Sequence, residues 1–136
     1  MRVVLDTNVI VSGLMRKNTP ADLVRQAWEA HRFTLVSSEW QLEELRRVSR
    51  YPRLQRYLRP HEVGSLVRQI RRAAIVLEFL PVIEASPDPD DDPILATALA
   101  GEAAWLVTGD KGDLLTLRKA HGVRMVTARA FLEILD

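Results

Sequence analysis

The chain of 136 residues contains no cysteine, which excludes disulfide scaffolds, zinc sites built from thiolates and cysteine nucleophiles. Its uncharged apolar runs are far too short to cross a membrane. The N-terminal residues MRVVLD lack the apolar stretch of a signal peptide and are typical of a first strand. These absences predict a cytoplasmic protein that does not act at a membrane. The net charge of +1 excludes no class of partner by itself.

Length and composition predict one globular domain over residues 1–136. Apolar residues make up 47% of the chain and charged residues 27%, which are ordinary values for a folded protein. A chain of this length hides roughly two-thirds of its surface on folding, so it can form a core without covalent cross-links.

The charges are unevenly distributed along the chain. Between Arg46 and Arg72 there are nine arginines and one acid, whereas the stretch from Glu78 to Asp92 holds six acids and no basic residue. A basic segment beside an acidic one indicates a polyanion-binding surface next to a cation-binding pocket. The alternative is that these arginines are only the solvent-exposed faces of two helices.

Hydrophobic periodicity and capping signals predict alternating strands and helices. The expected strands are residues 3–5, 33–36, 105–108 and 123–126, with 77–83 either a strand or the end of a helix. The expected helices are residues 8–15, 20–30, 38–50, 53–58, 60–74, 92–100, 113–121 and a last helix capped by Thr127. This alternation predicts a mostly parallel sheet of about four or five strands with helices on both faces.

Three aspartates are expected at one edge of this sheet. In parallel α/β folds, ligands bind outside the carboxyl ends of the strands. Asp6 directly follows the first strand, and Asp110 follows strand 105–108 after one glycine. Asp92 opens a helix after an acidic loop, where its carboxylate can face the same cleft. Each aspartate alone could be only a cap or a turn residue, but independent caps need not gather at one edge.

Helical geometry distinguishes Glu44 from its neighbour Glu43. At about 100° per residue, Glu44 lies on the border of the helix's apolar stripe, whereas Glu43 points away from it. Glu43 also precedes Arg47 by four residues, a favourable spacing for a surface ion pair. We therefore expect Glu44 to face the cleft and Glu43 to face solvent. The stripe itself consists of Leu42, Leu45 and Val48.

Carboxylates that converge without basic partners repel one another and raise one another's pKa values. A divalent cation removes this conflict, and ligation by oxygen alone suits Mg²⁺ or Mn²⁺. Such a site predicts metal-assisted hydrolysis of a phosphodiester bond.

Four segments of the chain resemble the PIN-domain ribonucleases: MRVVLDTNVIVSGL, SSEWQLEELRRV, DPDDDPILATALAGEAAWLVTGD and KGDLL. They are most similar to toxin components of bacterial and archaeal toxin–antitoxin systems, relatives of the VapC-type toxins. The resemblance covers essentially the whole chain and implies a three-layer α/β/α PIN-like fold. It also implies that Mg²⁺ or Mn²⁺ is bound by Asp6, Glu44, Asp92 and Asp110.

The resemblance implies an endoribonuclease that cuts single-stranded RNA with a metal-activated water and leaves a 5′-phosphate. It further implies a homodimer and a cognate antitoxin whose C-terminal segment fills the acidic cleft. The residues expected to orient the carboxylates or waters are Thr7, Asn8 and Thr108. The residues expected to hold the RNA backbone are Arg46, Arg47, Arg50 and Arg53.

The chain departs from the family pattern near Asp113. Many members have DLL directly after TGDK, whereas here Gly112 intervenes. Asp113 is either an additional metal ligand or only the N-cap of a helix from Leu114, and we favour the cap.

Two other functions stay open on the sequence. An RNA-binding PIN module without activity would keep the arginine surface, although all four acids are present. The opening VVLDTNV also resembles the strand–Asp–x–Asp pattern of haloacid-dehalogenase-like (HAD-like) phosphotransferases. Asn8 replaces the second aspartate of that pattern and so removes the general acid that this chemistry needs.

Overall fold

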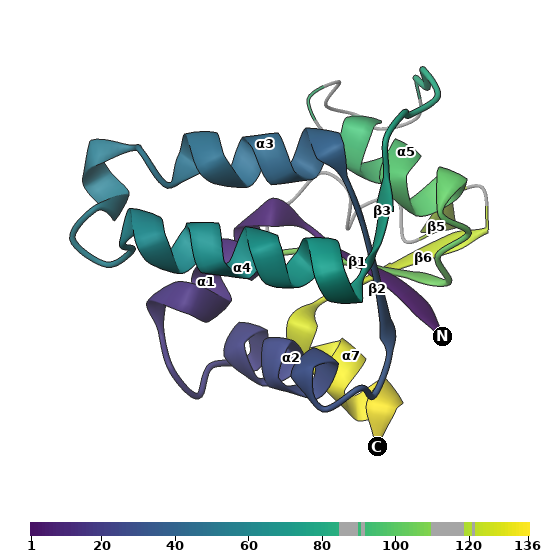
Figure 1. Cartoon of the computed structure of the whole chain (residues 1–136). Coiled ribbons are helices and arrows are strands. Elements are labelled where there is room, and N and C mark those ends of the chain that lie inside the picture. Colours follow the sequence, from purple (N-terminus) through teal and green to yellow (C-terminus); the bar gives the residue numbers. More distant parts are fainter. Residues whose placement is uncertain (85–89, 91, 110–118, 121) are drawn as a thin grey trace.

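The computed structural model describes residues 1–84, 90, 92–109, 119–120 and 122–136. Its strands are β1 (Arg2–Leu5), β2 (Thr34–Ser38), β3 (Ile75–Leu77), β4 (Trp105–Val107), β5 (Lys119–Ala120) and β6 (Val123–Val126). They form one sheet in the order β3-β2-β1-β4-β6-β5 (Figure 1). Five strands are parallel, and β5 pairs antiparallel with β6 at the edge. The mostly parallel sheet predicted from the sequence is confirmed.

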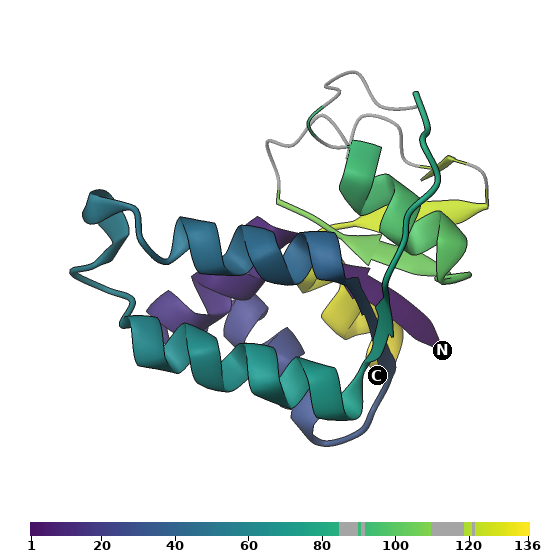
Figure 2. The same ribbon diagram turned by 45° about the horizontal axis from the view of Figure 1, so that its top comes forward.

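Helices cover both faces of the sheet. They are α1 (Thr7–Met15), α2 (Pro20–Glu29), α3 (Glu39–Val48), α4 (Pro60–Ala73), α5 (Asp92–Ala100) and α7 (Ala128–Leu135), with a 3₁₀ turn η1 (Pro52–Leu54). In both views of the chain α3 and α4 lie side by side, and α5 lies on the opposite side of the sheet (Figures 1 and 2). This is the expected three-layer α/β/α architecture.

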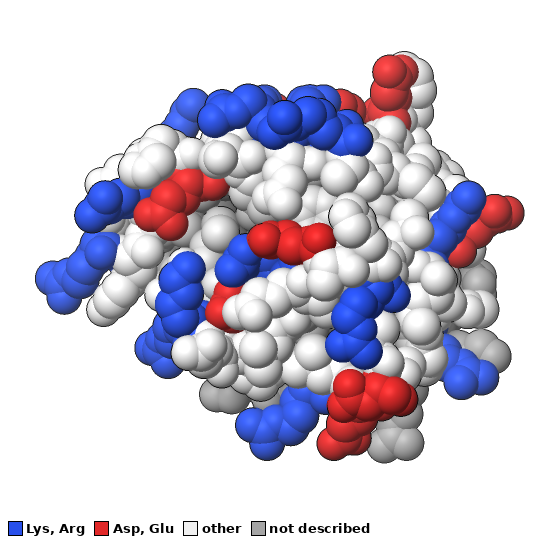
Figure 3. Space-filling view, turned by 60° about the horizontal axis from the view of Figure 1, so that its bottom comes forward, with Lys and Arg blue, Asp and Glu red and all other residues white. Residues whose placement is uncertain are grey.

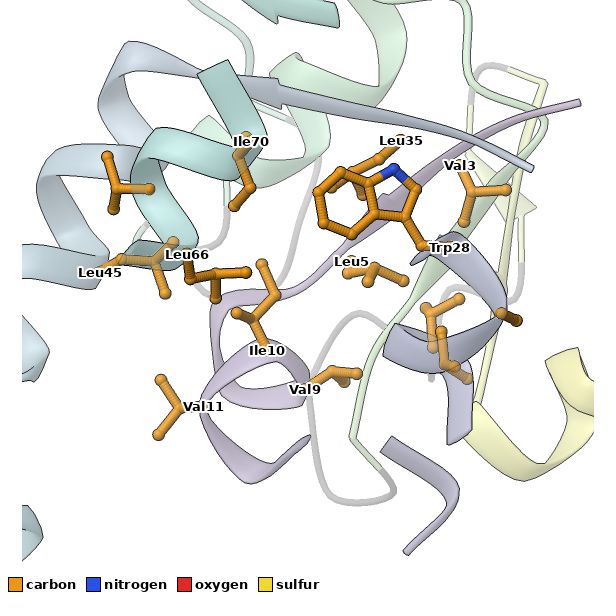
Figure 4. Close-up of a cluster of buried hydrophobic side chains, with 14 of the residues drawn as sticks. Val3, Leu5, Val9, Ile10, Val11, Trp28, Leu35, Leu45, Leu66 and Ile70 are labelled. Atoms are coloured by element: carbon orange, nitrogen blue, oxygen red, sulfur yellow. The ribbon is translucent and has the colours of Figure 1, made fainter. Parts of the chain in front are cut away.

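The buried strand β1 divides the core in two because its side chains alternate between the faces of the sheet. Val3 and Leu5 belong to the larger cluster, which packs under α1, α2, α3, α4 and α7. Figure 4 shows part of this cluster, with Trp28 of α2 beside Leu5. Val4 faces the other way and joins the smaller cluster under α5. Burial on both faces accounts for the unbroken apolar run that opens the chain.

Local capping signals fix where several helices begin. The backbone N–H of Asp22 donates to Thr19 at the start of α2, and that of Ala130 donates to Thr127 at the start of α7. The N–H of Gln41 likewise donates to Ser38 at the start of α3. Each hydroxyl satisfies one of the amide groups that a helix start leaves unpaired.

Several predicted elements are wrong or shortened. Residues 119–120 form β5 and not the end of a helix over 113–121, of which 113–118 and 121 lie outside the described residues. The helix expected over 60–74 ends at Ala73, and β3 follows it. The segment expected over 77–83 as a strand or the end of a helix belongs to β3 only at Leu77, and residues 78–83 are neither. The helix expected over 53–58 is only the turn η1. Strands of two or three residues carry too little periodicity to be predicted, because pairing with a neighbouring strand stabilises them.

None of the helices in the described part of the chain is long and apolar enough to span a bilayer.

Candidate active site

Asp6 is held at the junction of β1 and α1. Its backbone N–H donates to the carbonyl of Val107 at 2.8 Å, which ties it to the end of β4. Its carbonyl accepts from the N–H groups of Val9 and Ile10 in the first turn of α1. The side chain accepts a hydrogen bond of 2.8 Å from the hydroxyl of Thr108. The carboxylate therefore has a fixed position at the carboxyl edge of the sheet, where the sequence places it.

The environment of Asp6 disfavours its ionised form. Burial raises the pKa of this carboxyl above its ordinary value. The hydroxyl of Thr108 and the backbone amides of Thr7 and Asn8 act in the opposite direction, but they only partly offset the burial. A carboxylate held in this state gains from a cation placed beside it.

Glu44 of α3 faces inward, as helical geometry predicts. Its side chain is 21% exposed, whereas that of Glu43 is 81% exposed. Burial is the main cause that raises the pKa of Glu44, and a hydrogen bond with Thr7 opposes it. The negative charge of Asp6 raises this pKa further. The repulsion between converging carboxylates that the sequence predicts is therefore present between Glu44 and Asp6.

The expected surface pair of Glu43 with Arg47 is wrong. Arg47 instead donates to Glu44 at 3.4 Å, and Glu43 lies 4.0 Å from Arg46. Residues three apart on a helix are as close as residues four apart, so spacing alone does not choose between them. The consequence is that one guanidinium borders the inward-facing carboxylate.

Asp6 and Glu44 line one pocket of about 240 Å³, which we call the acidic pocket. Arg47, Trp40 and Tyr51 also lie at its wall. Thr7 and Asn8 also line it, so two of the three residues expected to orient the carboxylates lie at the site. The third, Thr108, is buried and reaches the site through its hydrogen bond with Asp6.

The start of α5 borders the acidic pocket. Asp90 and Ile94 both line it, and the charge of Asp90 contributes to the raised pKa of Glu44. Asp92 lies between these two residues in the chain, is the first residue of α5 and is half-buried. The sequence analysis did not select Asp90, because a run of neighbouring acids gives no local signal for which one faces the pocket.

Two of the expected metal ligands, Asp110 and Asp113, lie outside the described residues. Within the described residues, no group of three Asp, Glu, His or Cys side chains is placed so that it could hold a metal ion. The described part of the site thus consists of the Asp6–Glu44 pair and the neighbouring Asp90.

A buried polar network supports the pair from below, and the sequence analysis missed it. The side-chain amide of Gln41 donates to the carbonyl of Leu5 at 2.6 Å and to the hydroxyl of Thr7 at 3.5 Å. Its side-chain oxygen accepts from Ser37 at 2.6 Å. Gln41 therefore connects α3 with the end of β1 and with the threonine that contacts Glu44. Spacing shows Gln41 only as part of a capping pattern with Ser38.

A second arm of this network anchors α5. The hydroxyls of Ser38 and Thr97 lie 2.9 Å apart, and Thr97 donates to the carbonyl of Pro93 at 2.8 Å. Ser38 already accepts from the N–H of Gln41, so its own proton is available for Thr97. The first turn of α5 is thereby fixed relative to α3.

A second pocket, of about 440 Å³, adjoins the acidic pocket, and we call it the basic pocket. It is lined by Glu43, Arg46, Arg47, Arg50 and Tyr51. Arg47 and Tyr51 line both pockets, so the two pockets adjoin at the end of α3. The three predicted RNA-binding arginines of α3 and its end thus border one hollow.

The remaining basic residues form a mixed surface. Figure 3 shows a face on which Lys and Arg side chains gather along one edge and elsewhere lie among acidic side chains. Arg71, for example, forms an ion pair with Glu39. The basic pocket therefore stands out by its position next to the carboxylates and not by an excess of charge over the whole surface.

Comparison with known proteins agrees with this fold. Residues 2–112 match the PIN domain family. A solved structure described as VapBC2 from Rickettsia felis bound to a DNA fragment from their promoter contains a similar chain. The similarity has a TM-score of 0.58 at 16% sequence identity and covers 93% of this chain and 98% of the other. A search of curated proteins gave no match. The chain belongs to the PIN-domain family, whose members are nucleases that hydrolyse phosphodiester bonds.

Proposed function

We propose that this protein is a metal-dependent endoribonuclease that hydrolyses single-stranded RNA. The observation that carries the proposal is the Asp6–Glu44 pair. These are two desolvated carboxylates in one pocket that shares two wall residues with a pocket lined by arginines. Nothing in a binding module alone requires two acids to be held where burial disfavours the ionisation of both.

The chemistry of the site fits Mg²⁺ or Mn²⁺. Asp6 and Glu44 offer only oxygen donors, and burial raises the pKa of both carboxyls, so a cation bound beside them would favour their ionised forms. Asp92 and Asp110 are proposed to complete the site, with Asp113 an additional ligand or a helix cap. When bound, the cation lowers the pKa of water and neutralises charge on the phosphoryl group.

The side chains around the carboxylates have separate tasks. Thr108 and Thr7 hold Asp6 and Glu44 in place by hydrogen bonds, as partners of metal ligands commonly do. Arg47, which pairs with Glu44 at the pocket wall, is placed to meet a substrate phosphate. Hydrolysis adds the oxygen of water to phosphorus and breaks the bond to the 3′ oxygen, so the products are a 5′-phosphate and a 3′-hydroxyl.

The arginines along the basic pocket are proposed to hold the flanking RNA backbone. Arg46 and Arg50 line this pocket, and Arg53 lies directly beyond it, next to Tyr51. Planar guanidinium groups suit bidentate contact with phosphate.

We further propose that the nuclease is the toxin of a toxin–antitoxin pair and forms a homodimer. The support is the family match together with the likeness to a chain of the VapBC2 structure. The antitoxin would place a C-terminal segment in the acidic pocket.

The test is cleavage of an end-labelled pool of single-stranded RNA with Mg²⁺, Mn²⁺ or EDTA. Wild-type protein is expected to cut with either metal and not with EDTA, and Asp6→Asn is expected to be inactive while still binding RNA. Hydrolysis of a small phosphoester in place of RNA would favour the HAD-like phosphotransferase. RNA binding without turnover under any metal would favour the inactive PIN module.

A further inference from the structure

Tyr51 occupies the point where the two pockets meet. The residue lines both the acidic and the basic pocket and is 37% exposed. It lies three positions after Val48, the last residue of α3, so the ring is placed by the turn that follows the helix. An exposed aromatic ring at this position is accessible to a strand that passes between the pockets.

The chain holds Tyr51 in a defined conformation. The following residue is Pro52, which restricts the residue before it to extended backbone, and Tyr51 has φ −66° and ψ 125°. Its N–H donates to the carbonyl of Val48, so the ring stays next to the end of α3. The guanidinium of Arg53 lies 5.9 Å from the ring centroid, a cation–π distance that orients the ring.

The usual structural role of a tyrosine does not account for this placement. A core tyrosine buries its ring, whereas Tyr51 belongs to the exposed large side chains. Trp40, the other aromatic residue at the acidic pocket, is by contrast packed against the core cluster under α5. Tyr51 is therefore the aromatic side chain whose position serves the pockets and not the core.

We infer that Tyr51 is a stacking platform for a nucleobase of a single-stranded substrate. Aromatic rings next to basic grooves bind unpaired bases in this way, whereas the stacked bases of a duplex have no free face to offer. Stacking would hold one nucleotide beside the carboxylates, with Arg53 and the basic pocket on the neighbouring phosphates. This assignment rests on the proposed ribonuclease function and explains why that function would select single strands.

The test uses oligouridine with one 2-aminopurine, whose fluorescence falls when it stacks, placed at each position in turn. The Asp6→Asn protein keeps the strand uncut during the measurement. Stacking on one aromatic residue is worth roughly 1–3 kcal/mol, which corresponds to about 5- to 150-fold in affinity. We expect Tyr51→Ala in this background to raise Kd by a factor within that range and to abolish quenching. Tyr51→Phe should keep the Kd and the quenching of the protein that has Tyr51.

Two matched variants separate stacking from general effects. Tyr57→Ala removes a nearby tyrosine that is 55% exposed and does not line either pocket, so Kd and quenching should not change. Arg53→Gln removes the charge over the ring, so quenching should persist and the salt dependence of binding should weaken. Circular dichroism would verify that each variant is folded.

The assignment is overturned if Tyr51→Ala binds and quenches as Tyr51→Phe does, or if Tyr57→Ala has the same effect as Tyr51→Ala. Both readouts concern binding by an inactive protein. Failure of wild-type protein to cut RNA would count against the proposed function. Absence of base stacking on Tyr51 would count only against the present assignment, so the two failures are distinguishable.

Discussion

The hydroxyl of Thr108 donates a 2.8 Å hydrogen bond to the carboxylate of Asp6, although 102 positions separate the two residues. Asp6 follows β1 and Thr108 follows β4, and these strands are parallel neighbours in the sheet. The backbone N–H of Asp6 also donates to Val107. The pairing of two strands thus places a neutral donor against the carboxylate that the proposed chemistry depends on.

Replacing this donor should weaken the site without removing an acid. In Thr108→Val, Asp6 loses the hydrogen bond that opposes its raised pKa, so its ionised form becomes still less favourable. Partners of this kind typically contribute about 10- to 100-fold to metal affinity or activity. We expect a loss in that range in Mn²⁺ binding by calorimetry and in RNA cleavage.

Thr108→Ser serves as the matched control, because it keeps the hydroxyl and should retain most of the activity. Thr34→Val removes a hydroxyl from an exposed position at the start of β2 and should have no effect. Equal activity of Thr108→Val and wild type would show that the hydrogen bond does not support the site.

Asp6→Asn should raise the thermal stability of the metal-free protein near pH 7. The pKa of Asp6 is higher in the folded than in the unfolded state, so the folded protein holds this proton more tightly. The unfolded state then binds fewer protons, and stability falls as pH rises through the window that begins near the unfolded value of about 3.9. Asp6→Asn should therefore be thermally more stable than wild type at pH values above this window.

Melting curves of the two proteins with EDTA, recorded from about pH 3 to pH 7, would test this sign. At the acid end both forms of residue 6 are neutral, so the two melting temperatures should converge. A variant that is less stable than wild type near pH 7 would contradict the prediction.

Glu44→Gln should abolish cleavage, whereas Glu43→Gln should leave it close to wild type. The two residues are neighbours of the same type, but Glu44 is desolvated beside Asp6 and Glu43 is exposed. We expect the Glu44 variant to lose more than the roughly 100-fold that removal of an outer partner costs. Single-turnover cleavage rates would measure both, and equal losses would contradict the assignment of Glu44 to the site.

Asp22 should show the opposite dependence on pH from Asp6. Burial alone would raise its pKa, but hydrogen bonds from the backbone of Asn18, from Arg25 and from Gln26 more than offset it, so the pKa is lowered. The resulting stability is present above the unfolded pKa of about 3.9 and is lost as pH falls through the folded value. Asp22→Ala removes these hydrogen bonds to a buried carboxylate and should lower the free energy of unfolding by about 2 kcal/mol near pH 7.

Urea unfolding at several pH values would measure this loss, and it should shrink on acidification. Glu29→Gln is the control, because Glu29 pairs with the same Arg25 but has a side chain that is 40% exposed. Glu29→Gln should lower the free energy of unfolding only slightly, as is usual for surface ion pairs. A pH-independent cost of Asp22→Ala would show that packing and not charge is responsible.

The sequence by itself determined the features that depend on local periodicity. The buried run of β1, the caps at Ser38 and Thr127, and the inward face of Glu44 all follow from spacings of two to four residues. The position of Asp6 follows from the rule that a parallel sheet gathers its ligand-binding residues at the carboxyl edge. These features predict the fold and two of the acids that the structure brings together.

Only the tertiary structure decided which partner each side chain meets. Gln41 donates to the carbonyl of Leu5, and Asp90 lines the acidic pocket beside Glu44. These contacts join segments that are brought together by the packing of the helices on the sheet. Local sequence spacing therefore does not predict them. The pKa values of Asp6 and Glu44 are set in the same way, because desolvation comes from packing between distant parts of the chain.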